Sequence, residues 1–292
     1  MPTRFLNSGT AIRIVLLTVF AFASGISQAE LIDFASCADP EGAAIQAADC
    51  HAFDNRAYFG PVRDQGEGDL CWSFAATALL EEEACREDPS TCGQALSVLD
   101  AARCVRAERA GGDPYFALQC ALNSGVCQEN DAPYTASFGL LRMMPISRVC
   151  EKNRYQFSNR MLQPASVNFA DNEQKLFTTI SRKWSELNRL AQSGRSFGVD
   201  FCTREEASSR GKNDGDESCG AHSVVVNAMK FENCECKMHI RNSWGDRPEF
   251  SGWTSSTSMI QRIYRLNYLR QAKPHPISSG RGRAGSSFRG RH

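Results

Sequence analysis

The spacing of apolar residues divides the chain into a helical first half and a second half with short strands. Helix-forming residues run from position 72 to position 86, with apolar side chains close to one face, and they stop before Asp88. This pattern predicts a helix with Cys71 at its N-terminus. Three further helices are predicted over residues 95–105, 114–123 and 172–191.

Apolar runs beyond residue 163 are short and predict strands. They cover residues 197–201, Phe-Gly-Val-Asp-Phe, and residues 223–229, Ser-Val-Val-Val-Asn-Ala-Met. Between them, the polar residues 205–218 predict a surface loop. The end of the chain, rich in Arg, Gly and Ser, is predicted to be disordered.

The first residues have the pattern of a signal peptide. Arg4 and Arg13 precede an apolar run over residues 14–23, and the small residues Ser27 and Ala29 follow it. The run is too short to span a bilayer as an ordinary helix, which disfavours the alternative of an uncleaved anchor. We therefore expect export, either to a periplasm or out of the cell, and no membrane association after cleavage.

The cysteine content fits an exported protein. In an oxidising compartment most of the 13 cysteines would form disulfides, and the odd number leaves one thiol unpaired. One catalytic cysteine and twelve bridged ones account for that number. Cys234 and Cys236 with His239 do not have the spacing of a common zinc site, so disulfides are favoured there as well. We expect no metal and no cofactor.

Composition limits the partners. The chain has 292 residues, 42% of them hydrophobic, which is enough for a core in one or two lobes. The 33 Lys and Arg residues equal the 33 Asp and Glu residues, so a nucleic-acid partner is not expected. The arginines of the C-terminal tail resemble segments that touch RNA, but they are few for an exported protein. We expect a monomer that acts on a protein or peptide substrate.

Three residues far apart in the sequence could form a thiol-based catalytic site. Cys71 would lie at the positive end of a helix dipole, which lowers a thiol pKa. His222 begins a strand-like run and could take the thiol proton. Asn242 follows another short apolar segment and could orient the imidazole ring by accepting a hydrogen bond from its second nitrogen.

At these residues the sequence resembles the papain family of cysteine peptidases. Gly-Pro-Val-Arg-Asp-Gln-Gly at 60–66 and Cys-Trp-Ser-Phe at 71–74 resemble the glutamine and the nucleophile of that family. His222 and Asn-Ser-Trp-Gly at 242–245 are similar to its histidine strand and its asparagine signature. Weaker similarity over residues 96–104, 111–119, 125–126 and 132–134 supports the match, which extends from about Asn55 to Asn267.

The resemblance implies a role for each matching residue. Cys71 would attack the scissile carbonyl, His222 would pass its proton to the leaving amine, and Asn242 would hold the imidazole ring. Gln65 would donate a hydrogen bond to the oxyanion, beside the Cys71 amide. Trp244 would cover the histidine and asparagine from water.

Further residues would contact the substrate. The Gly111-Gly112 strip would offer main-chain hydrogen bonds to an extended peptide, and Pro114 would line the pocket for the second residue before the cut. Asp69 stands where the family has a glycine at the edge of the first pocket. It could favour cleavage after a basic residue, or it could cap the following helix or lie in solvent.

Two features depart from the family pattern. The residue three before Cys71 is Gly68 and not cysteine, so the usual disulfide beside the nucleophile cannot form and Cys104 must pair elsewhere. The lead before the peptidase is short, whereas the family carries a long inhibitory propeptide. Restraint of the activity could come from the compartment, from a separate protein inhibitor or from the lead lying over the cleft.

The resemblance implies an α+β, papain-like fold with two lobes: a helical N-terminal lobe holding Cys71 and an antiparallel sheet or barrel lobe holding His222 and Asn242. The active site would lie in the groove between them. The predicted segments are a signal peptide (1–29), a lead (30–54), the helical lobe (55–165), the β lobe (166–270) and the tail (271–292).

The predicted function is hydrolysis of peptide bonds through a thioester formed on Cys71, with His222 as general base and acid. Two alternatives use the same fold. The cysteine and histidine could transfer an acyl group to an amine, as in peptide ligation. The protein could also be catalytically inactive and bind peptides in the cleft.

Overall fold

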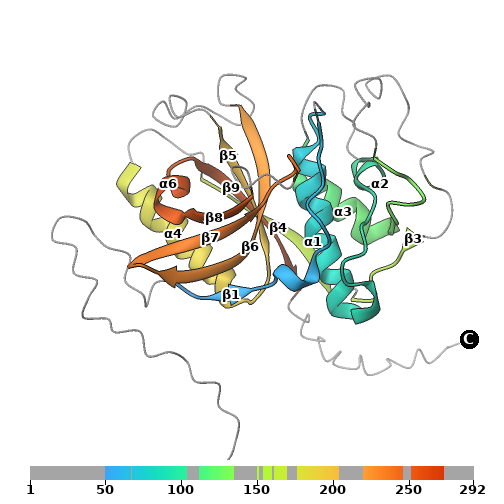
Figure 1. Cartoon of the computed structure of the whole chain (residues 1–292), viewed down its shortest axis with the longest axis horizontal. Coiled ribbons are helices and arrows are strands. Elements are labelled where there is room, and N and C mark those ends of the chain that lie inside the picture. Colours follow the sequence, from blue (N-terminus) through green and yellow to red (C-terminus); the bar gives the residue numbers. More distant parts are fainter. Residues whose placement is uncertain are drawn as a thin grey trace, which may run out of the picture. The chain divides into compact units, whose positions relative to one another are not determined.

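The computed structural model describes residues 50–66, 68–103, 112–134, 150, 154–159, 161–169, 176–203, 220–245 and 251–272, all within one compact unit. The α+β class is confirmed, since three helices, α1 (Cys71–Glu87), α2 (Val98–Ala102) and α3 (Pro114–Ser124), gather on one side of this unit, and an antiparallel sheet with α4 (Leu176–Gln192) and α6 (Ser256–Ile260) forms the other (Figure 1). The predicted signal peptide, the loop at 205–218 and the C-terminal tail lie outside the described residues.

Helix α1 (Cys71–Glu87) is the central element of the helical side. Nearly all of its residues are buried. It begins directly at Cys71 and ends before Asp88, because a residue that precedes a proline disfavours the helical conformation. A short 3₁₀-helix, η4 (Pro89–Thr91), follows it, and the disulfide between Cys85 and Cys92 closes this turn. The predicted helix at 72–86 is confirmed.

Two shorter helices pack against α1. In α3 (Pro114–Ser124), Asp113 caps the first turn by accepting from the Tyr115 amide, and Gly125 ends the helix with φ of 71°. Helix α2 (Val98–Ala102) is shorter than the predicted 95–105, because Leu96 forms a β-bridge with Gln128 and Ser97 is already the N-cap.

The sheet has seven strands, and all of its pairings are antiparallel. The order along the sheet is β4 (Leu162–Asn168), β9 (Ile263–Gln271), β5 (Phe197–Cys202), β6 (Ala221–Glu232), β7 (Glu235–Arg241) and β8 (Gly252–Ser255), while β1 (Phe53–Asp54) pairs with β6. The two predicted strands are confirmed, although β6 is longer than predicted. It continues to a tight hairpin turn at Asn233 and Cys234, which both have positive φ.

Smaller elements complete the fold. Strands β2 (Val126–Cys127) and β3 (Arg154–Tyr155) form a separate two-stranded ladder. Helix α4 (Leu176–Gln192) agrees with the helix predicted at 172–191, as far as the described residues reach. The remaining short elements are η3 (Arg56–Tyr58) and α6 (Ser256–Ile260).

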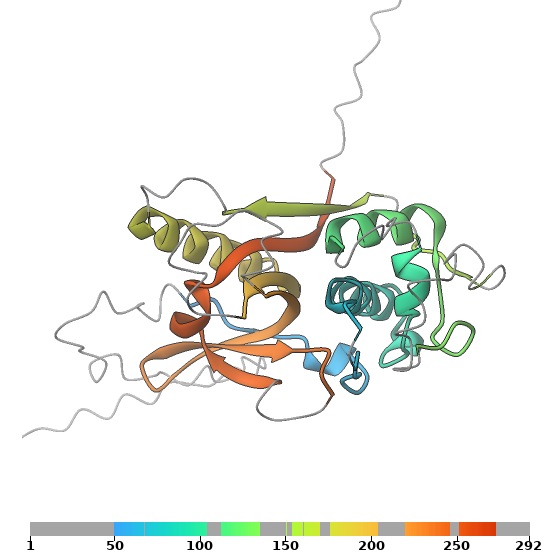
Figure 2. The ribbon, with the colours of Figure 1, turned by 90° about the horizontal axis from the view of Figure 1, so that it is seen from above.

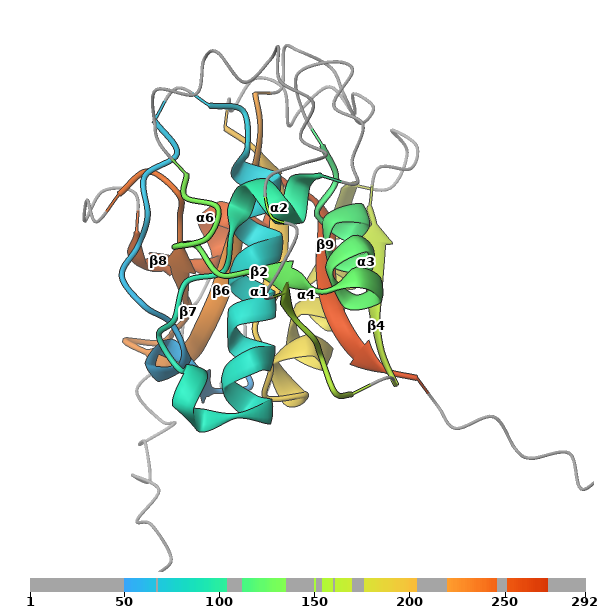
Figure 3. The same cartoon turned by 90° about the vertical axis from the view of Figure 1, so that its right-hand side faces the viewer.

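Two hydrophobic clusters form the core. One lies within the sheet side, where Leu187, Leu190 and Ala191 of α4 pack on β5, β6, β7 and β9. The other joins α1, α2 and α3 and also takes in Leu162 and Leu269, from β4 and β9. The two lobes therefore share a packed interface, with β4 and β9 reaching α3 at one end (Figure 2) and α1 lying in front of β6 (Figure 3).

The end of the predicted lead is part of the sheet side. Strand β1 lies within residues 30–54 and pairs with β6, and Cys50 is disulfide-bonded to Cys236 of β7. The boundary expected between residues 165 and 166 falls inside β4.

Three consecutive glutamates hold α1 in place. Glu81, Glu82 and Glu83 are all buried, with exposed fractions of 3–4%. Successive helical residues point about 100° apart, so the three carboxylates face different neighbours. Their guanidinium partners are Arg63 for Glu81, Arg86 for Glu82 and Arg195 for Glu83.

Glu82 connects α1 to the sheet side. Besides Arg86, its carboxylate accepts hydrogen bonds from the Asn55 side chain at 3.1 Å and from the Ser196 amide at 3.1 Å. Asn55 and Ser196 lie just before η3 and β5. The position of α1 is therefore fixed by ion pairs on several sides as well as by apolar contact.

Replacing Glu82 by alanine should lower the free energy of unfolding by about 3–5 kcal/mol, because it leaves the half-buried Arg86 without its carboxylate. The matched control is Glu186→Ala, which removes the exposed pair with Arg189 on α4 and should cost less than about 1 kcal/mol. Denaturant unfolding followed by circular dichroism measures both. Equal losses would contradict this account of α1.

Replacing Gly112 by alanine should also destabilise the fold, by about 1–3 kcal/mol. A Cβ at this position would lie 2.3 Å from the indole of Trp72, which is buried and held by a hydrogen bond from its Nε1 to the Asp69 carbonyl. At Gly198 the nearest atom to a Cβ is 3.4 Å away, so Gly198→Ala should change stability by less than about 1 kcal/mol. Thermal unfolding of both variants tests the difference.

Candidate active site

Cys71 has a free thiol at the N-terminus of α1, and the other nine cysteines of the described chain are all bridged. Three of their disulfides are Cys50–Cys236, Cys85–Cys92 and Cys127–Cys150, and Cys120, Cys202 and Cys234 are bridged as well. The expectation of one unpaired cysteine therefore holds for the described residues. Cys104 lies outside them.

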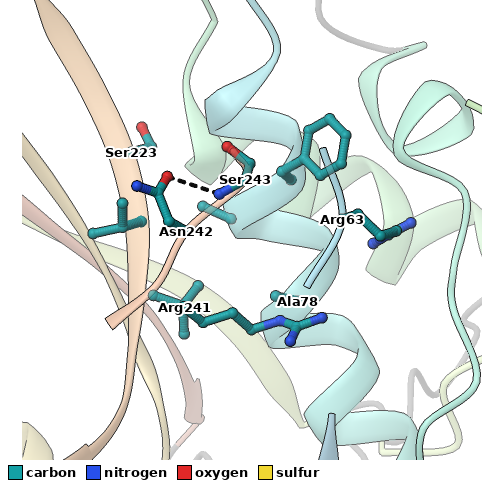
Figure 4. A pocket seen from close by; sticks show the side chains of 10 residues that line it. Arg63, Ala78, Ser223, Arg241, Asn242 and Ser243 are labelled. Atoms are coloured by element: carbon teal, nitrogen blue, oxygen red, sulfur yellow. Dashed lines mark hydrogen bonds between the residues drawn. The ribbon is translucent and has the colours of Figure 1, made fainter. Parts of the chain in front are cut away.

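His222 is anchored by Asn242. The ring Nε2 lies 2.7 Å from the Asn242 Oδ1, and the Ser243 amide donates to the same oxygen at 2.7 Å (Figure 4). The Ser243 contact identifies this atom as the oxygen of the side-chain amide, because a backbone N–H can only donate. The oxygen only accepts, so Nε2 carries the hydrogen. In the neutral ring, Nδ1 is then the atom that can take a proton.

Two aromatic rings enclose the imidazole of His222. Trp244 stacks on it, with 4.1 Å between ring centroids and 21° between planes. Phe201 of β5 meets the ring at 79°, with 5.7 Å between centroids. His222 is only 3% exposed, so Trp244 covers the histidine as the sequence led us to expect.

The protonation of Cys71 and His222 depends on burial as well as on hydrogen bonds. Burial raises the pKa of the Cys71 thiol, although hydrogen bonding from the Ser223 and Trp72 amides lowers it. The Trp72 amide belongs to the N-terminus of α1, so the expected lowering is present, but desolvation is the larger effect and the net shift of the thiol pKa is upward. Burial also lowers the pKa of the His222 imidazole, against the opposite effect of the Asn242 hydrogen bond. Both shifts favour the neutral thiol and the neutral imidazole.

Gln65 is buried and held by three contacts. Its Oε1 accepts from the Ser243 hydroxyl at 2.5 Å, and its backbone amide donates to the Ser243 carbonyl at 2.7 Å. Its Nε2 donates to the Gly68 carbonyl at 2.6 Å. An amide nitrogen carries two hydrogens, so a second donor on Nε2 remains for a ligand. Ser243 thus positions both Gln65 and Asn242.

The predicted substrate-binding residues lie beside α1 and at the start of α3. Gly112 abuts Trp72, and Pro114 is the buried first residue of α3, whereas Gly111 lies outside the described residues. Asp69 is exposed. It does not cap α1, since Leu70 is the N-cap residue and no side chain caps this end. The capping alternative for Asp69 is therefore wrong.

A small pocket lies at the contact between the lobes (Figure 4). Side chains of α1 line one wall, and Ser223, Asn242 and Ser243 line the other. Arg63 and Arg241 also line the pocket. Most of the lining residues are buried, so this is an internal gap and not a substrate cleft.

The described residues contain no group of three or more His, Cys, Asp and Glu side chains that could hold a metal ion. Cys234 and Cys236 are bridged, and His239 bonds to Asn227 at 2.7 Å, which leaves no zinc cluster at these three residues. Across the helices that the structure describes, none combines the length and the apolar character needed to cross a bilayer.

Sequence reasoning missed Ser223 and Asp200. Ser223 follows His222 directly, and its hydroxyl donates to the Asp200 carboxylate at 2.6 Å. Asp200 is completely buried in β5. The signal was present in the sequence, since Asp200 is the one charged residue in the apolar run Phe-Gly-Val-Asp-Phe at 197–201.

Comparison with known proteins gives one match to a characterised relative and many to solved structures. Cathepsin R of Mus musculus is 35% identical over 95 residues, which are 31% of this chain and 28% of cathepsin R. The alignment thus spans less than a third of that relative.

The solved structures agree with the two-lobed fold. Digestive procathepsin L 3 from the larval midgut of Tenebrio molitor superposes with a TM-score of 0.52 at 18% identity, over 76% of this chain and 70% of that chain. The bromelain protease of Ananas comosus, in complex with the inhibitor E64, gives a TM-score of 0.50 at 18% identity, over 76% and 99%. At such identities the likeness shows the fold alone.

The sequence match to the family described as "Papain family cysteine protease" covers residues 48–265. This range contains Cys71 on α1, His222 on β6, and Asn242. The chain therefore belongs to the papain family of cysteine proteases.

Proposed function

We propose that this protein is an exported cysteine peptidase that hydrolyses peptide bonds with Cys71 as nucleophile and His222 as general base and acid. The observation that carries the proposal is the fixed tautomer of His222: with Nε2 bound to Asn242, Nδ1 is the ring atom that can accept a proton, and Cys71 at the start of α1 is an unpaired thiol. The disulfides of the described chain support export to an oxidising compartment.

The first half of the reaction forms a thioester. Nδ1 of His222 takes the proton from the Cys71 sulfur, and the thiolate attacks the scissile carbonyl carbon. The oxyanion that forms would accept from the second Nε2 hydrogen of Gln65 and from the Cys71 amide. When the carbon–nitrogen bond breaks, His222 returns its proton to the leaving amine.

The second half releases the acid. A water molecule gives a proton to Nδ1 of His222 and attacks the thioester carbonyl. The carbon–sulfur bond then breaks, and the proton returns to the sulfur. Burial raises the pKa of the Cys71 thiol and lowers that of the His222 imidazole, so both shifts favour the neutral groups at the start of the cycle.

Peptide substrates would bind along the start of α3. Gly112 lies so close to the indole of Trp72 that a Cβ there would overlap it. Because glycine has no side chain, the main chain at this position can pair with an extended peptide. Pro114, the first residue of α3, would line the adjoining pocket. Acyl transfer to an amine would use the same steps, with an amine in place of water, and product analysis separates the two.

An epoxide or vinyl sulfone peptide inhibitor should form a covalent adduct on Cys71 that mass spectrometry can map. Cys71→Ala should abolish the adduct. His222→Ala should slow its formation at least about 100-fold, because the thiol loses its base. A folded protein that binds the peptide but leaves Cys71 unmodified would instead support the alternative of an inactive peptide-binding protein.

Asp69→Asn should weaken cleavage after Arg or Lys by about tenfold, because it removes an exposed carboxylate at the edge of the first substrate pocket. Cleavage after uncharged residues should not change. The control is Glu186→Gln, which neutralises a carboxylate on α4. Profiling with matched fluorogenic peptides measures the preference, and an unaltered preference for basic residues would remove the specificity role of Asp69.

A further inference from the structure

The loop that leads into Cys71 contains a glycine that the backbone itself does not require. Gly68 lies three residues before Cys71, where the sequence departs from the family pattern, and its φ is not positive. A Cβ at this position would nevertheless lie 2.5 Å from the hydroxyl oxygen of Tyr134. Such a contact is far shorter than van der Waals distance. The hydroxyl of Tyr134 therefore occupies the space that a side chain at residue 68 would need.

The same hydroxyl holds Gln65, the residue proposed to donate to the oxyanion. It donates to the Gln65 carbonyl at 2.6 Å, and the Gly68 amide donates to the same carbonyl at 3.1 Å. The Gln65 side chain turns back toward the Gly68 carbonyl, to which its Nε2 donates at 2.6 Å. The Tyr134 hydroxyl thus lies against the backbone of Gln65 and against the residue that holds the Gln65 side chain.

Tyr134 is fixed by neighbours on two sides. Its ring meets Phe74 of α1 edge to face, with 5.0 Å between centroids and 85° between planes. Its backbone amide donates to Glu129 at 2.5 Å, and the other oxygen of Glu129 pairs with Arg63 at 3.0 Å. Because Arg63 lies two residues before Gln65, the segment that carries Tyr134 is attached twice to the loop that carries Gln65.

The phenol of Tyr134 is a hydrogen-bond donor in this arrangement. Burial raises the pKa of its hydroxyl, and the charges of Asp64 and Asp69 raise it further. A neutral phenol has one hydrogen to donate, and it is directed at the Gln65 carbonyl. The contact between Tyr134 and Gln65 is therefore retained over the pH range in which the thiol chemistry operates.

We propose that Tyr134 is a positioning residue for the oxyanion site, where its hydroxyl fills the space beside Gly68 and holds Gln65 in place. The second hydrogen on the Gln65 Nε2 is then directed at the carbonyl oxygen of the substrate. The inference rests on the proposed function, in which Gln65 donates to the oxyanion. One hydrogen bond thus fastens the loop at the residue where no disulfide can form. Tyr134 acts through Gln65 and exchanges no proton with the substrate.

Tyr134→Phe removes only the hydroxyl and should lower kcat for peptide cleavage by about tenfold with KM little changed, because the oxyanion forms only as the reaction proceeds. Alkylation of Cys71 by iodoacetamide should keep its wild-type rate, since displacement of iodide develops no oxyanion. A merely structural role would disturb the thiol as well and slow both reactions. The matched control is Tyr155→Phe, which removes a hydroxyl that contacts Ala84 and Glu87 near the other end of α1 and should change neither rate.

The contact between Gly68 and Tyr134 provides a second test. Gly68→Ala places a methyl group against the hydroxyl and should also lower kcat by about tenfold. In the double variant with Tyr134→Phe the 2.5 Å contact is gone, and the nearest atom to the Cβ is the Gln65 carbonyl oxygen at 3.2 Å. Both changes remove the same interaction, so the double variant should lose about tenfold in kcat and not about a hundredfold.

Three results would overturn the proposal: an unchanged kcat in Tyr134→Phe, equal slowing of cleavage and alkylation, or additive losses in the double variant. Thermal unfolding checks that each variant is folded. If Gly68→Ala does not fold, the comparison of cleavage with alkylation in Tyr134→Phe decides alone.

A peptide aldehyde separates this inference from the proposed function, because its reversible addition to Cys71 uses the oxyanion donors but involves no hydrolysis. The bound aldehyde protects Cys71 from iodoacetamide, and Tyr134→Phe should raise the concentration needed for half protection by about tenfold. If the wild-type protein is protected but cleaves no peptide, weaker protection of Tyr134→Phe would refute hydrolysis and leave the role of Tyr134 standing. Peptide cleavage with equal protection of both proteins would do the reverse. A wild-type protein that is neither protected nor active would refute both.

Discussion

The structure depends on helix α1, which is buried between the lobes and whose three glutamates are each paired with an arginine. Glu81, Glu82 and Glu83 point in different directions around the helix, and each meets an arginine. Rotation or sliding of the helix would leave a buried charge unpaired, at a cost of several kcal/mol. Because Cys71 is the first residue of α1, the same ion pairs fix where the sulfur lies relative to β6. The position of the Cys71 thiol is thus set by charges in the C-terminal half of its helix.

The second half of the site is set by hydrogen bonds between backbone and side chains. Asn242 follows β7, and Ser243 holds the Asn242 oxygen through its amide while its hydroxyl holds Gln65. The imidazole of His222 therefore has one nitrogen bound and one available, independently of any substrate. Stacking by Trp244 prevents the ring from turning away from this orientation. Burial raises the pKa of the Cys71 thiol and lowers that of the His222 imidazole, and both shifts favour the neutral groups.

Local patterns were sufficient for most of the elements, and the structure brings two of the predicted site residues, His222 and Asn242, into contact. The helix formers after Cys71 and the proline after Asp113 correctly predicted α1 and α3, whose ends depend on nearby residues. Features that depend on distant contacts were not predicted. Helix α2 is short because Leu96 pairs with a residue far along the chain. The thiol pKa is raised because the lobes together bury most of Cys71, an effect that a helix dipole considered alone does not include.

Asp200 shows how the sheet accommodates a buried charge and is joined to the helical lobe. An unpaired carboxylate in the middle of a sheet would be strongly destabilising, and Arg265, Asn267 and Ser223 supply the donors that it needs. Arg265 also donates to Asp113, the N-cap residue of α3. An apolar residue at position 200 would need no partners in the strand, but it would leave the Ser223 hydroxyl without its acceptor and Arg265 with one carboxylate instead of two. The buried charge in the sheet therefore helps to fix the position of α3 against β9.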